Sequence, residues 1–273
     1  MVRTSAEHDA SCRERCQPAA EPGFAEREPE EAGDVRPSWY ALSGGGWRDY
    51  VTVLHLPYTA WHLAYVVIGG CLAPGVAWGR LGAAVAAFGL AVGIGAHALD
   101  ELRGRPQQTK IPDAVLVGLA AASIVAACGI GLVGAATFRL WLAVLVPVGL
   151  FLVLAYNLEL ARGRFHNDLW FGLAWGGFPV ICGYAAVAGE IGVAAVLAAA
   201  FAVFLSLAQR ALSSHVRFVR RRVVAVHGEL ELGDGGQRAL DTSWLIAAEE
   251  HGLRLLAASV VVLAVAMVVF RLG

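Results

Sequence analysis

The sequence has few charged residues. Asp, Glu, Lys and Arg make up 16% of the 273 residues, against about 25% in soluble globular domains. Apolar residues account for 58% of the chain, and its mean hydropathy is +0.61. This balance excludes a water-soluble protein with a single core. It also excludes disorder over most of the length, because disordered chains need low hydrophobicity.

An excess of charge of one sign is also missing. The formal net charge is −1, and Lys110 is the one lysine among 21 cationic residues. A nucleic-acid-binding domain needs a basic surface, so nucleic acid is not expected as a partner. Cysteine is sparse too, with five residues of which three lie inside apolar runs, where the thiol acts as a small apolar group.

Residues 1–45 differ in composition from the rest of the chain. Up to Val35 they hold nine acids against four arginines and almost no large apolar side chain. This composition predicts a disordered acidic tail on the cytoplasmic side. No apolar stretch follows its charges, so the tail is not interpreted as a signal peptide. The remaining residues, 46–273, are expected to form one transmembrane domain.

Apolar runs dominate the chain after Val51. Each run has about twenty residues, the length that spans a ~30 Å hydrocarbon core. Backbone groups in a bilayer must be satisfied internally, so the runs are expected to be helices. Seven runs are expected: 51–73, 81–102, 113–135, 138–158, 168–188, 191–213 and 248–270. The predicted fold is therefore an all-α polytopic membrane bundle of about seven transmembrane helices.

Loop charges predict the orientation of the bundle. The loops after the second, fourth and sixth runs hold ten basic residues, whereas the other loops hold only Arg80 and Arg139. The positive-inside rule then places the N-terminus and the even-numbered loops in the cytoplasm and the C-terminus outside. A multi-pass protein of the cell membrane, surrounded by lipids, is expected. The basic run 220–222 is interpreted as a topology signal only.

Ionisable residues gather at the end of the second run. His97, Asp100 and Glu101 have the i, i+3, i+4 spacing that shares one face of a helix. Two carboxylates there could hold Mg²⁺, which commonly takes one or two carboxylates together with substrate phosphates. The cations that follow could contact phosphate oxygens: Arg103, Arg105 and Lys110. The alternative is that both acids mark the helix end and pair with the following arginines.

Further polar residues lie on the same predicted side of the membrane. After the fourth run come Tyr156, Asn157, Glu159, Arg162, Arg164, His166, Asn167 and Asp168. Asp168 by itself is better explained as the N-cap of the fifth helix. The Gly176–Pro179 step is expected to bend that helix and to open space beside it. In the first run, His55 and His62 are interpreted as interior histidines with satisfied hydrogen bonds.

The sixth and seventh runs add a third polar group. The sixth ends with Gln209 and Ser213 and has no acid, and the seventh begins with Glu249, Glu250 and His251. If these elements meet the end of the second run, a mixed site suited to a transition metal would form. Its ligands would be His97, Asp100, Glu101, Glu250 and His251.

Two stretches of the chain resemble the UbiA superfamily of intramembrane prenyltransferases. Asp100, followed by Arg105-Pro106, resembles the first aspartate-rich motif of that family. The stretch from Tyr156 through residues 168–184 is similar to the region of the fourth and fifth helices. The resemblance covers about residues 50–270, and residues 168–184 are its most specific part.

The resemblance implies a UbiA-like bundle around a central cavity that opens to the membrane. In the family, Mg²⁺ and an isoprenyl diphosphate bind at the cytoplasmic mouth, and the allylic cation is captured by an acceptor or cyclised. The residues thereby expected to be catalytic are Asp100, Glu101 and Tyr156, with Asp100 and Glu101 as metal ligands. The expected substrate-binding residues are His97, Arg103, Arg105, Lys110, Asn157, Arg162, Asp168, Gln209 and Ser213.

The chain departs from the family pattern at several motif positions. In the first motif, Ala96, His97 and Gly104 accompany Asp100, so one aspartate of three is present. Gln209 and Ser213 stand where the second motif has acids, and Arg162 is the residue available for a lysine that follows the tyrosine. The expected seven spans replace eight or nine.

Three functions are left open at this point. The first is a UbiA-like, Mg²⁺-dependent prenyltransferase that moves an isoprenyl group from a polyprenyl diphosphate to a lipophilic acceptor, with a UbiA-type terpene cyclase as a variant. The second is a non-catalytic relative that binds a lipid or a protein partner. The third is the transition-metal enzyme.

Overall fold

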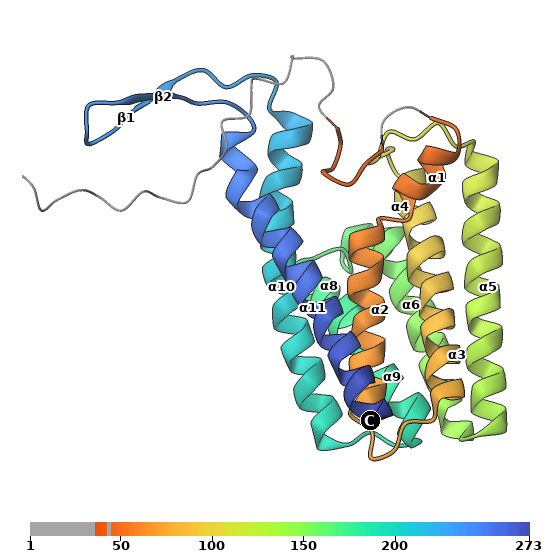
Figure 1. Cartoon of the computed structure of the whole chain (residues 1–273). Coiled ribbons are helices and arrows are strands. Elements are labelled where there is room, and N and C mark those ends of the chain that lie inside the picture. The colour runs from red at the N-terminus through yellow and green to blue at the C-terminus, as the bar shows by residue number, and fades with distance from the viewer. Residues whose placement is uncertain (1–35, 43–44) are drawn as a thin grey trace, which may run out of the picture. The chain divides into compact units, whose positions relative to one another are not determined.

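A computed structural model describes residues 36–42 and 45–273 (Figure 1). The predicted disorder of residues 1–35 falls outside the described part of the chain. The folded unit runs from Arg36 to Gly273. It therefore includes residues 36–42, which the sequence had assigned to the tail.

Helices make up most of the described chain. The first half holds α1 (Trp47–Val53), α2 (Leu56–Cys71), α3 (Trp78–Phe88), the π-helical segment η1 (Gly89–Ala96), α4 (His97–Leu102) and α5 (Asp113–Thr137). The middle holds the 3₁₀ segment η2 (Leu140–Val144), α6 (Leu145–Asn157), α7 (Leu160–Gly163), α8 (Asp168–Phe171), the π-helical segment η3 (Gly172–Gly177) and α9 (Phe178–Ala188). The last part holds α10 (Val193–Arg222), strands β1 (Glu229–Glu231) and β2 (Gln237–Ala239), the 3₁₀ segment η4 (Trp244–Ile246) and α11 (Ala247–Leu272).

Six continuous helices of the described chain are long and apolar enough to cross a membrane. They are Trp78–Leu102, Asp113–Thr137, Leu140–Asn157, Asp168–Ala188, Val193–Arg222 and Trp244–Leu272. The bent pair α1 and α2 makes a seventh if it counts as one span. This confirms the predicted class, a helical chain with six or seven apolar segments that could span a membrane.

Three features differ from the expected helices. The first span is bent by 44° between α1 and α2, where His55 has left-handed backbone angles. Helix α10 continues to Arg222, nine residues past the apolar run, because its polar last turns pack against η4 and α11. The polar loop after it forms a short antiparallel hairpin of β1 and β2, so the described chain is not purely α-helical.

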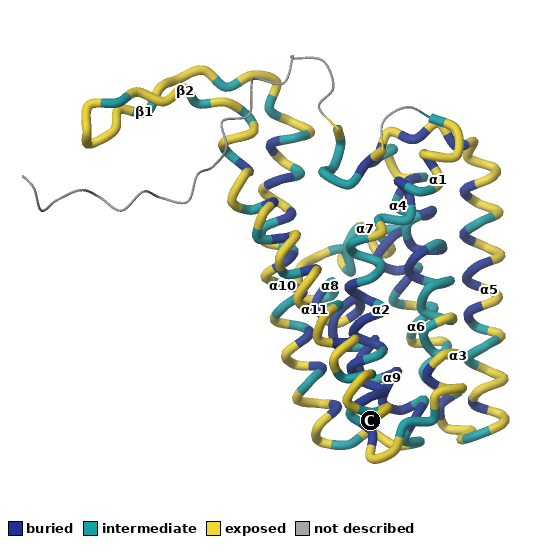
Figure 2. The backbone as a smooth tube through the Cα atoms, in the orientation of Figure 1, coloured by how far each residue is buried: buried dark blue, intermediate teal, exposed yellow. Residues whose placement is uncertain are grey.

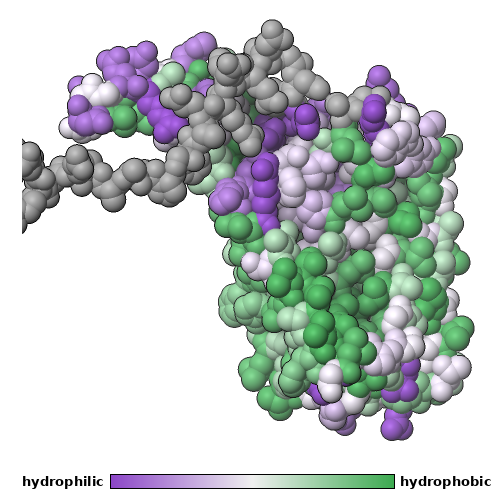
Figure 3. Space-filling model, in the orientation of Figure 1, coloured by the Kyte–Doolittle hydropathy of each residue, from purple (hydrophilic) through white to green (hydrophobic). Residues whose placement is uncertain are grey.

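Large apolar side chains cover much of the outer surface. Figure 2 shows exposed residues along the outward faces of α5, α10 and α11, and Figure 3 shows a hydrophobic surface over the body of the helices with polar residues at their ends. Exposed members include Val125 and Val133 on α5, Phe204 on α10 and Phe270 on α11. Such a continuous apolar surface suits contact with lipid better than contact with water.

Glycines let two central helices pack with their backbones in contact. A Cβ atom added to Gly69 of α2 would overlap the carbonyl oxygen of Val180 in α9, and one added to Gly183 of α9 would overlap that of Val66 in α2. Small residues allow this close approach in membrane bundles. Helices α2 and α9 therefore form a tightly fixed pair beside the candidate site.

Two π-helical segments interrupt the spans near that site. Segment η1 precedes α4, which carries Asp100, and η3 carries Trp175. Isolated π-turns inside α-helices occur frequently at functional sites. At the Gly176–Pro179 step, where a bend was expected, the span Asp168–Ala188 is continuous and changes from π-helix to α-helix after Gly177, and Gly176 lies against the backbone of Ala202 in α10.

Candidate functional site

A polar cavity of about 250 Å³ lies among the helix ends on the side of the predicted cytoplasmic loops. Its walls come from the start of α2, the ends of η1, α4 and α6, and the start of η3. The last turns of α10 complete it. Ionisable and amide side chains that line it are His55, His62, His97, Asp100, Gln107, Asn157, His166, Gln209, Arg210, Arg217 and Arg221.

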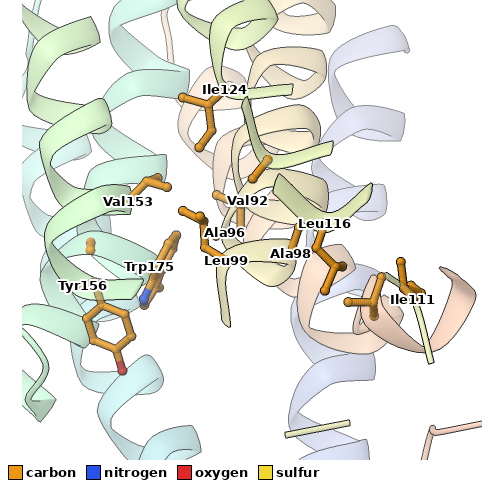
Figure 4. Packing of buried hydrophobic residues seen from close by; sticks show 13 residues of the cluster. Val92, Ala96, Ala98, Leu99, Ile111, Leu116, Ile124, Val153, Tyr156 and Trp175 are labelled. Carbon is orange, nitrogen blue, oxygen red and sulfur yellow. The ribbon is translucent and has the colours of Figure 1, made fainter. Parts of the chain in front are cut away.

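A second cavity of about 200 Å³ is apolar and lies farther along the bundle. Alanines, glycines and larger apolar side chains of α3, η1, α5, α6 and α9 line it. Val92 and Trp175 line both cavities, so the two spaces lie next to each other with these side chains between them. Figure 4 shows Val92 and Trp175 with Val153 and Tyr156 in the buried cluster at this junction.

Asp100 and Glu101 have different surroundings. Asp100 lines the polar cavity and has no ion pair or side-chain hydrogen bond with any described residue. Glu101 is fully buried, outside the cavity lining, where it accepts hydrogen bonds from Gln107 N at 2.9 Å, Thr109 N at 2.9 Å and Thr109 Oγ1 at 2.8 Å. Its carboxylate organises the loop after α4, so we leave Glu101 out of the candidate site.

The cations predicted to bind substrate lie outside the cavity lining. Arg103 donates to Leu158 O and Glu159, and Arg105 pairs with Asp113 at the start of α5. Lys110 and Arg162 have exposed side chains. The alternative in which Asp100 and Glu101 pair with Arg103 and Arg105 is wrong, because both arginines bind other partners.

Tyr156 and Asp168 are connected through Arg210, whereas Asn157 is bonded within its own helix. The Tyr156 hydroxyl accepts a hydrogen bond from Arg210 Nη1 at 2.6 Å, and Asp168 Oδ1 lies 2.5 Å from Arg210 Nε. Asn157 donates to Val153 O at 2.7 Å while lining the cavity. The interpretation of Asp168 as a helix cap is wrong, because the side chain of Asn167 accepts from Trp170 N at that position.

Helix α10 presents a polar face to the cavity. Gln209 and Ser213, the residues at the positions of the second motif, are buried and both line it. Gln209 Oε1 is buried and has no hydrogen-bond partner among the described residues. Arg217 donates to the hydroxyls of Ser213 and Ser214 at 3.0 Å each.

Three histidines line the opposite wall. The rings of His55 and His97 stack with centroids 4.3 Å apart, and His62 Nδ1 donates to Trp175 O at 2.8 Å. His62 is therefore satisfied, as expected, whereas His55 Nε2 is buried with no partner in the described residues. The left-handed backbone of His55 is strained for a residue with a side chain, a feature that concentrates at functional sites.

Residues 37–40 close the cavity from outside. Ser38 donates to Gln107 Oε1 at 2.8 Å, and the guanidinium of Arg254 lies 4.9 Å from the centroid of a Trp39 ring. The Tyr40 hydroxyl lies 3.1 Å from His55 Nδ1. Burial, with a smaller effect of Tyr58, raises the pKa of Tyr40, so the phenol stays protonated.

The cavity offers few ligands for a cation. Asp100 is its one acid within the described chain, and no group of three His, Cys, Asp or Glu side chains that could hold a metal occurs in residues 36–42 and 45–273. Glu250 pairs with Arg220 at 2.6 Å and His251 is exposed, so neither joins His97 and Asp100. These residues do not fit the two-motif Mg²⁺ site that the resemblance implies, nor the mixed transition-metal site.

Several lining residues escaped the sequence interpretation. Arg217 and Arg221 had been counted as topology charges, although Ser213, Arg217 and Arg221 follow one another at four-residue steps and share a helix face. This four-residue periodicity could have identified Arg217 and Arg221 as lining residues. It becomes visible only if the helix is expected to continue beyond Ser213. His166 was named among the polar residues after the fourth run but was given no role, and its ring stacks on that of Tyr156 with centroids 4.4 Å apart.

Comparison with protein-family models, curated proteins and solved structures finds no match to this chain.

Proposed function

We propose that this chain is a UbiA-like membrane prenyltransferase that uses an isoprenyl diphosphate and a lipophilic acceptor. The observation that supports it best is the junction at Val92 and Trp175, where an apolar cavity lies next to one lined by arginines. An amphipathic molecule with an apolar tail and an anionic head matches this pair of spaces. In the proposal, the protein lies in the membrane with the polar cavity on the cytoplasmic side.

The polar cavity suits a phosphate-bearing head group. Arg210, Arg217 and Arg221 line it against a single acid, Asp100. Guanidinium groups match the geometry of phosphate oxygens and form short, charge-assisted hydrogen bonds with them. The apolar cavity would take the isoprenyl chain, because its walls are almost entirely apolar side chains.

Aromatic residues gather where the reacting carbon would lie. Tyr156, Phe171 and Trp175 line the polar cavity, and the Tyr156 and Trp175 rings meet edge-on with centroids 5.7 Å apart. Aromatic faces stabilise cations. In the proposed reaction the C–O bond of the allylic diphosphate breaks, the electron pair leaves with the diphosphate, and the acceptor bonds to the carbon. Asp100 takes the proton that the acceptor loses.

The test uses purified protein in lipid nanodiscs with geranylgeranyl diphosphate, with and without a mixture of quinol and phenol acceptors. Binding is followed by thermal stabilisation and the reaction by release of inorganic diphosphate. Release that needs the acceptor supports the prenyltransferase. Release without an acceptor, with a cyclised hydrocarbon product, would make the chain a terpene cyclase.

Binding without release would identify the non-catalytic alternative. The observation that favours this alternative is the single acid in the polar cavity, since several carboxylates are expected for a two-motif site. A protein that neither binds nor is stabilised by geranylgeranyl diphosphate would contradict both functions. Asp100→Asn adds a check, because the proposal expects it to bind substrate but to release diphosphate at a rate lower by about 10²–10⁴-fold.

A further inference from the structure

The charges of the polar cavity are distributed unevenly between its walls. Every arginine that lines it comes from the last turns of α10, namely Arg210, Arg217 and Arg221. Asp100 is the one acid among the described lining residues. The cavity therefore has an excess of positive charge on one side before any ligand binds.

Two of these arginines have no carboxylate partner within the described chain. Arg210 is paired with Asp168, but Arg217 binds only the hydroxyls of Ser213 and Ser214. Arg221 has no ion pair or side-chain hydrogen bond to any residue of 36–42 and 45–273. The adjacent Arg220, which faces α11, is by contrast fully paired with Glu250.

Arg217 and Arg221 thus face the cavity without a carboxylate partner among the described residues. Arg217 is partly buried, and an enclosed charge is costly unless it is matched, so its lack of a carboxylate partner in the described chain indicates an anionic ligand in the cavity. Gln209 points to the same conclusion, since its buried Oε1 lacks a partner in the described residues while its side chain lines the cavity.

Gln209 and Ser213 are neutral residues, so neither forms an ion pair with the arginines that line the cavity. Ser213 Oγ lies 3.0 Å from Arg217 Nη1, so an aspartate there would pair with Arg217 and cancel its charge. Ser213 and Gln209 are also the positions at which the resemblance would place metal-binding acids. The chain has an arginine face on α10 where acids and a metal would otherwise be needed.

We propose that Arg217 and Arg221 neutralise the diphosphate in place of a divalent metal, so that the substrate binds independently of Mg²⁺. The proposal rests on the proposed function and specifies how its site holds the head group. Charge-assisted hydrogen bonds from two guanidinium groups take over the role of the metal.

The experiment measures binding of a non-hydrolysable geranylgeranyl thiodiphosphate to purified protein in nanodiscs, in EDTA and in Mg²⁺. Wild type is expected to bind with a Kd that differs by less than about twofold between the two conditions, since no metal takes part. Arg217→Gln and Arg221→Gln are each expected to weaken binding about tenfold or more in both conditions. Arg222→Gln is the matched control, because Arg222 is the next residue, exposed and outside the cavity lining, and its Kd should not change.

Two further variants separate charge from metal. Asp100→Asn removes the one acid of the cavity lining in the described chain. If no metal takes part, the Kd of the thiodiphosphate should stay the same or fall. If Asp100 holds a metal that binds the diphosphate, the Kd should rise. Ser213→Asp should weaken metal-free binding by pairing with Arg217. If Arg217→Gln does not fold, the comparison of Arg221→Gln with Arg222→Gln decides alone, because both residues are exposed at the end of α10.

The failures are distinguishable. Binding by wild type in Mg²⁺ but not in EDTA would overturn the metal-free inference and leave the proposed function standing. Binding in neither condition would overturn the proposed function itself. Equal Kd values for Arg221→Gln and Arg222→Gln would show that the arginine face does not hold the head group.

Discussion

Asp100 and Glu101 are consecutive residues whose carboxylates do different work. Successive side chains on an α-helix point about 100° apart, so a cavity beside the helix receives only one of them. Asp100 lines the cavity, while Glu101 accepts three hydrogen bonds from the loop at residues 107–109. The buried carboxylate thereby fixes the loop that Ser38 also contacts.

Glu101→Gln should destabilise the fold. In the wild type, both carboxylate oxygens of Glu101 accept hydrogen bonds. The glutamine replaces one of these oxygens with an NH₂ group, which cannot accept, so a buried donor is left unsatisfied at a cost of about 1–3 kcal/mol. A lower melting temperature in detergent is the measurement. The matched variant Asp100→Asn should melt close to wild type, since Asp100 accepts no hydrogen bond from the described residues. Equal melting temperatures for wild type and Glu101→Gln would contradict this structural role.

The candidate site could be predicted in part at this scale. The sequence identified Asp100, His97, Tyr156, Asn157, Gln209 and Ser213, and all of these line the polar cavity. Arg103, Arg105, Lys110 and Arg162 were chosen because they follow these motifs in the chain. The direction of such side chains depends on the conformation of the loop, which cannot be read from the sequence. These four cations therefore lie outside the cavity lining, although they were expected to bind the substrate.

Among the elements, α2 and α9 depend most on single residues. Their backbones touch where Gly69 meets Val180 and where Gly183 meets Val66. Both contacts involve backbone oxygens, which cannot move aside as a flexible side chain could. The pair also carries His62 and leads into Trp175 through η3, so its spacing sets one wall of the polar cavity.

Gly69→Ala or Gly183→Ala should therefore separate α2 from α9 and destabilise the protein by more than about 1–3 kcal/mol, the usual cost of overpacking a core. Gly118→Ala on α5 is the control, because its added methyl group meets no atom within 4 Å. That change should be neutral or slightly stabilising, since alanine favours a helix by about 1 kcal/mol over glycine. Similar thermal melting curves for Gly69→Ala and Gly118→Ala would refute the close packing.

The helices themselves were predictable because a membrane segment must be long and apolar. The expected run 113–135 corresponds to α5, and 168–188 corresponds to the helix Asp168–Ala188. A search for apolar stretches could not predict the last nine residues of α10, because these residues are largely polar and their helix packs against η4 and α11. The break at His55 was also missed, although Pro57 was a local signal, since proline favours the first turn of a helix and Pro57 lies in the first turn of α2.

For the whole molecule, the length of α10 bears on how it lies in a membrane. Its 30 residues span about 45 Å, longer than a ~30 Å hydrocarbon core. The apolar part begins at Val193, so the surplus turns around Ser213–Arg222 extend past the core toward the loops rich in arginine. The polar cavity would then lie at the level of the lipid head groups.

Reporter fusions test the expected orientation. Ten basic residues lie between the sequence-expected spans at the cavity end, four of them in the last turns of α10, against two at the other end, which predicts that the cavity end is cytoplasmic. A fluorescent protein inserted between β1 and β2 should be fluorescent, and alkaline phosphatase fused after Gly273 should be active outside. Activity of the opposite reporters would reverse the orientation and place the polar cavity on the outer side.

The π-helical segment η1 also bears on which insertions and deletions the chain can tolerate. A π-turn holds one residue more than the α-turn it replaces, and each residue of a helix turns the chain by about 100°. Loss of a single residue between Gly89 and Ala96 would restore α geometry and leave Asp100 facing the cavity, whereas loss of one residue from the α-helical part, α3, would rotate Asp100 relative to the start of the helix by about 100°. Among homologous chains, a one-residue gap in this segment should therefore be compatible with the site, whereas a one-residue gap in α3 should mark its loss.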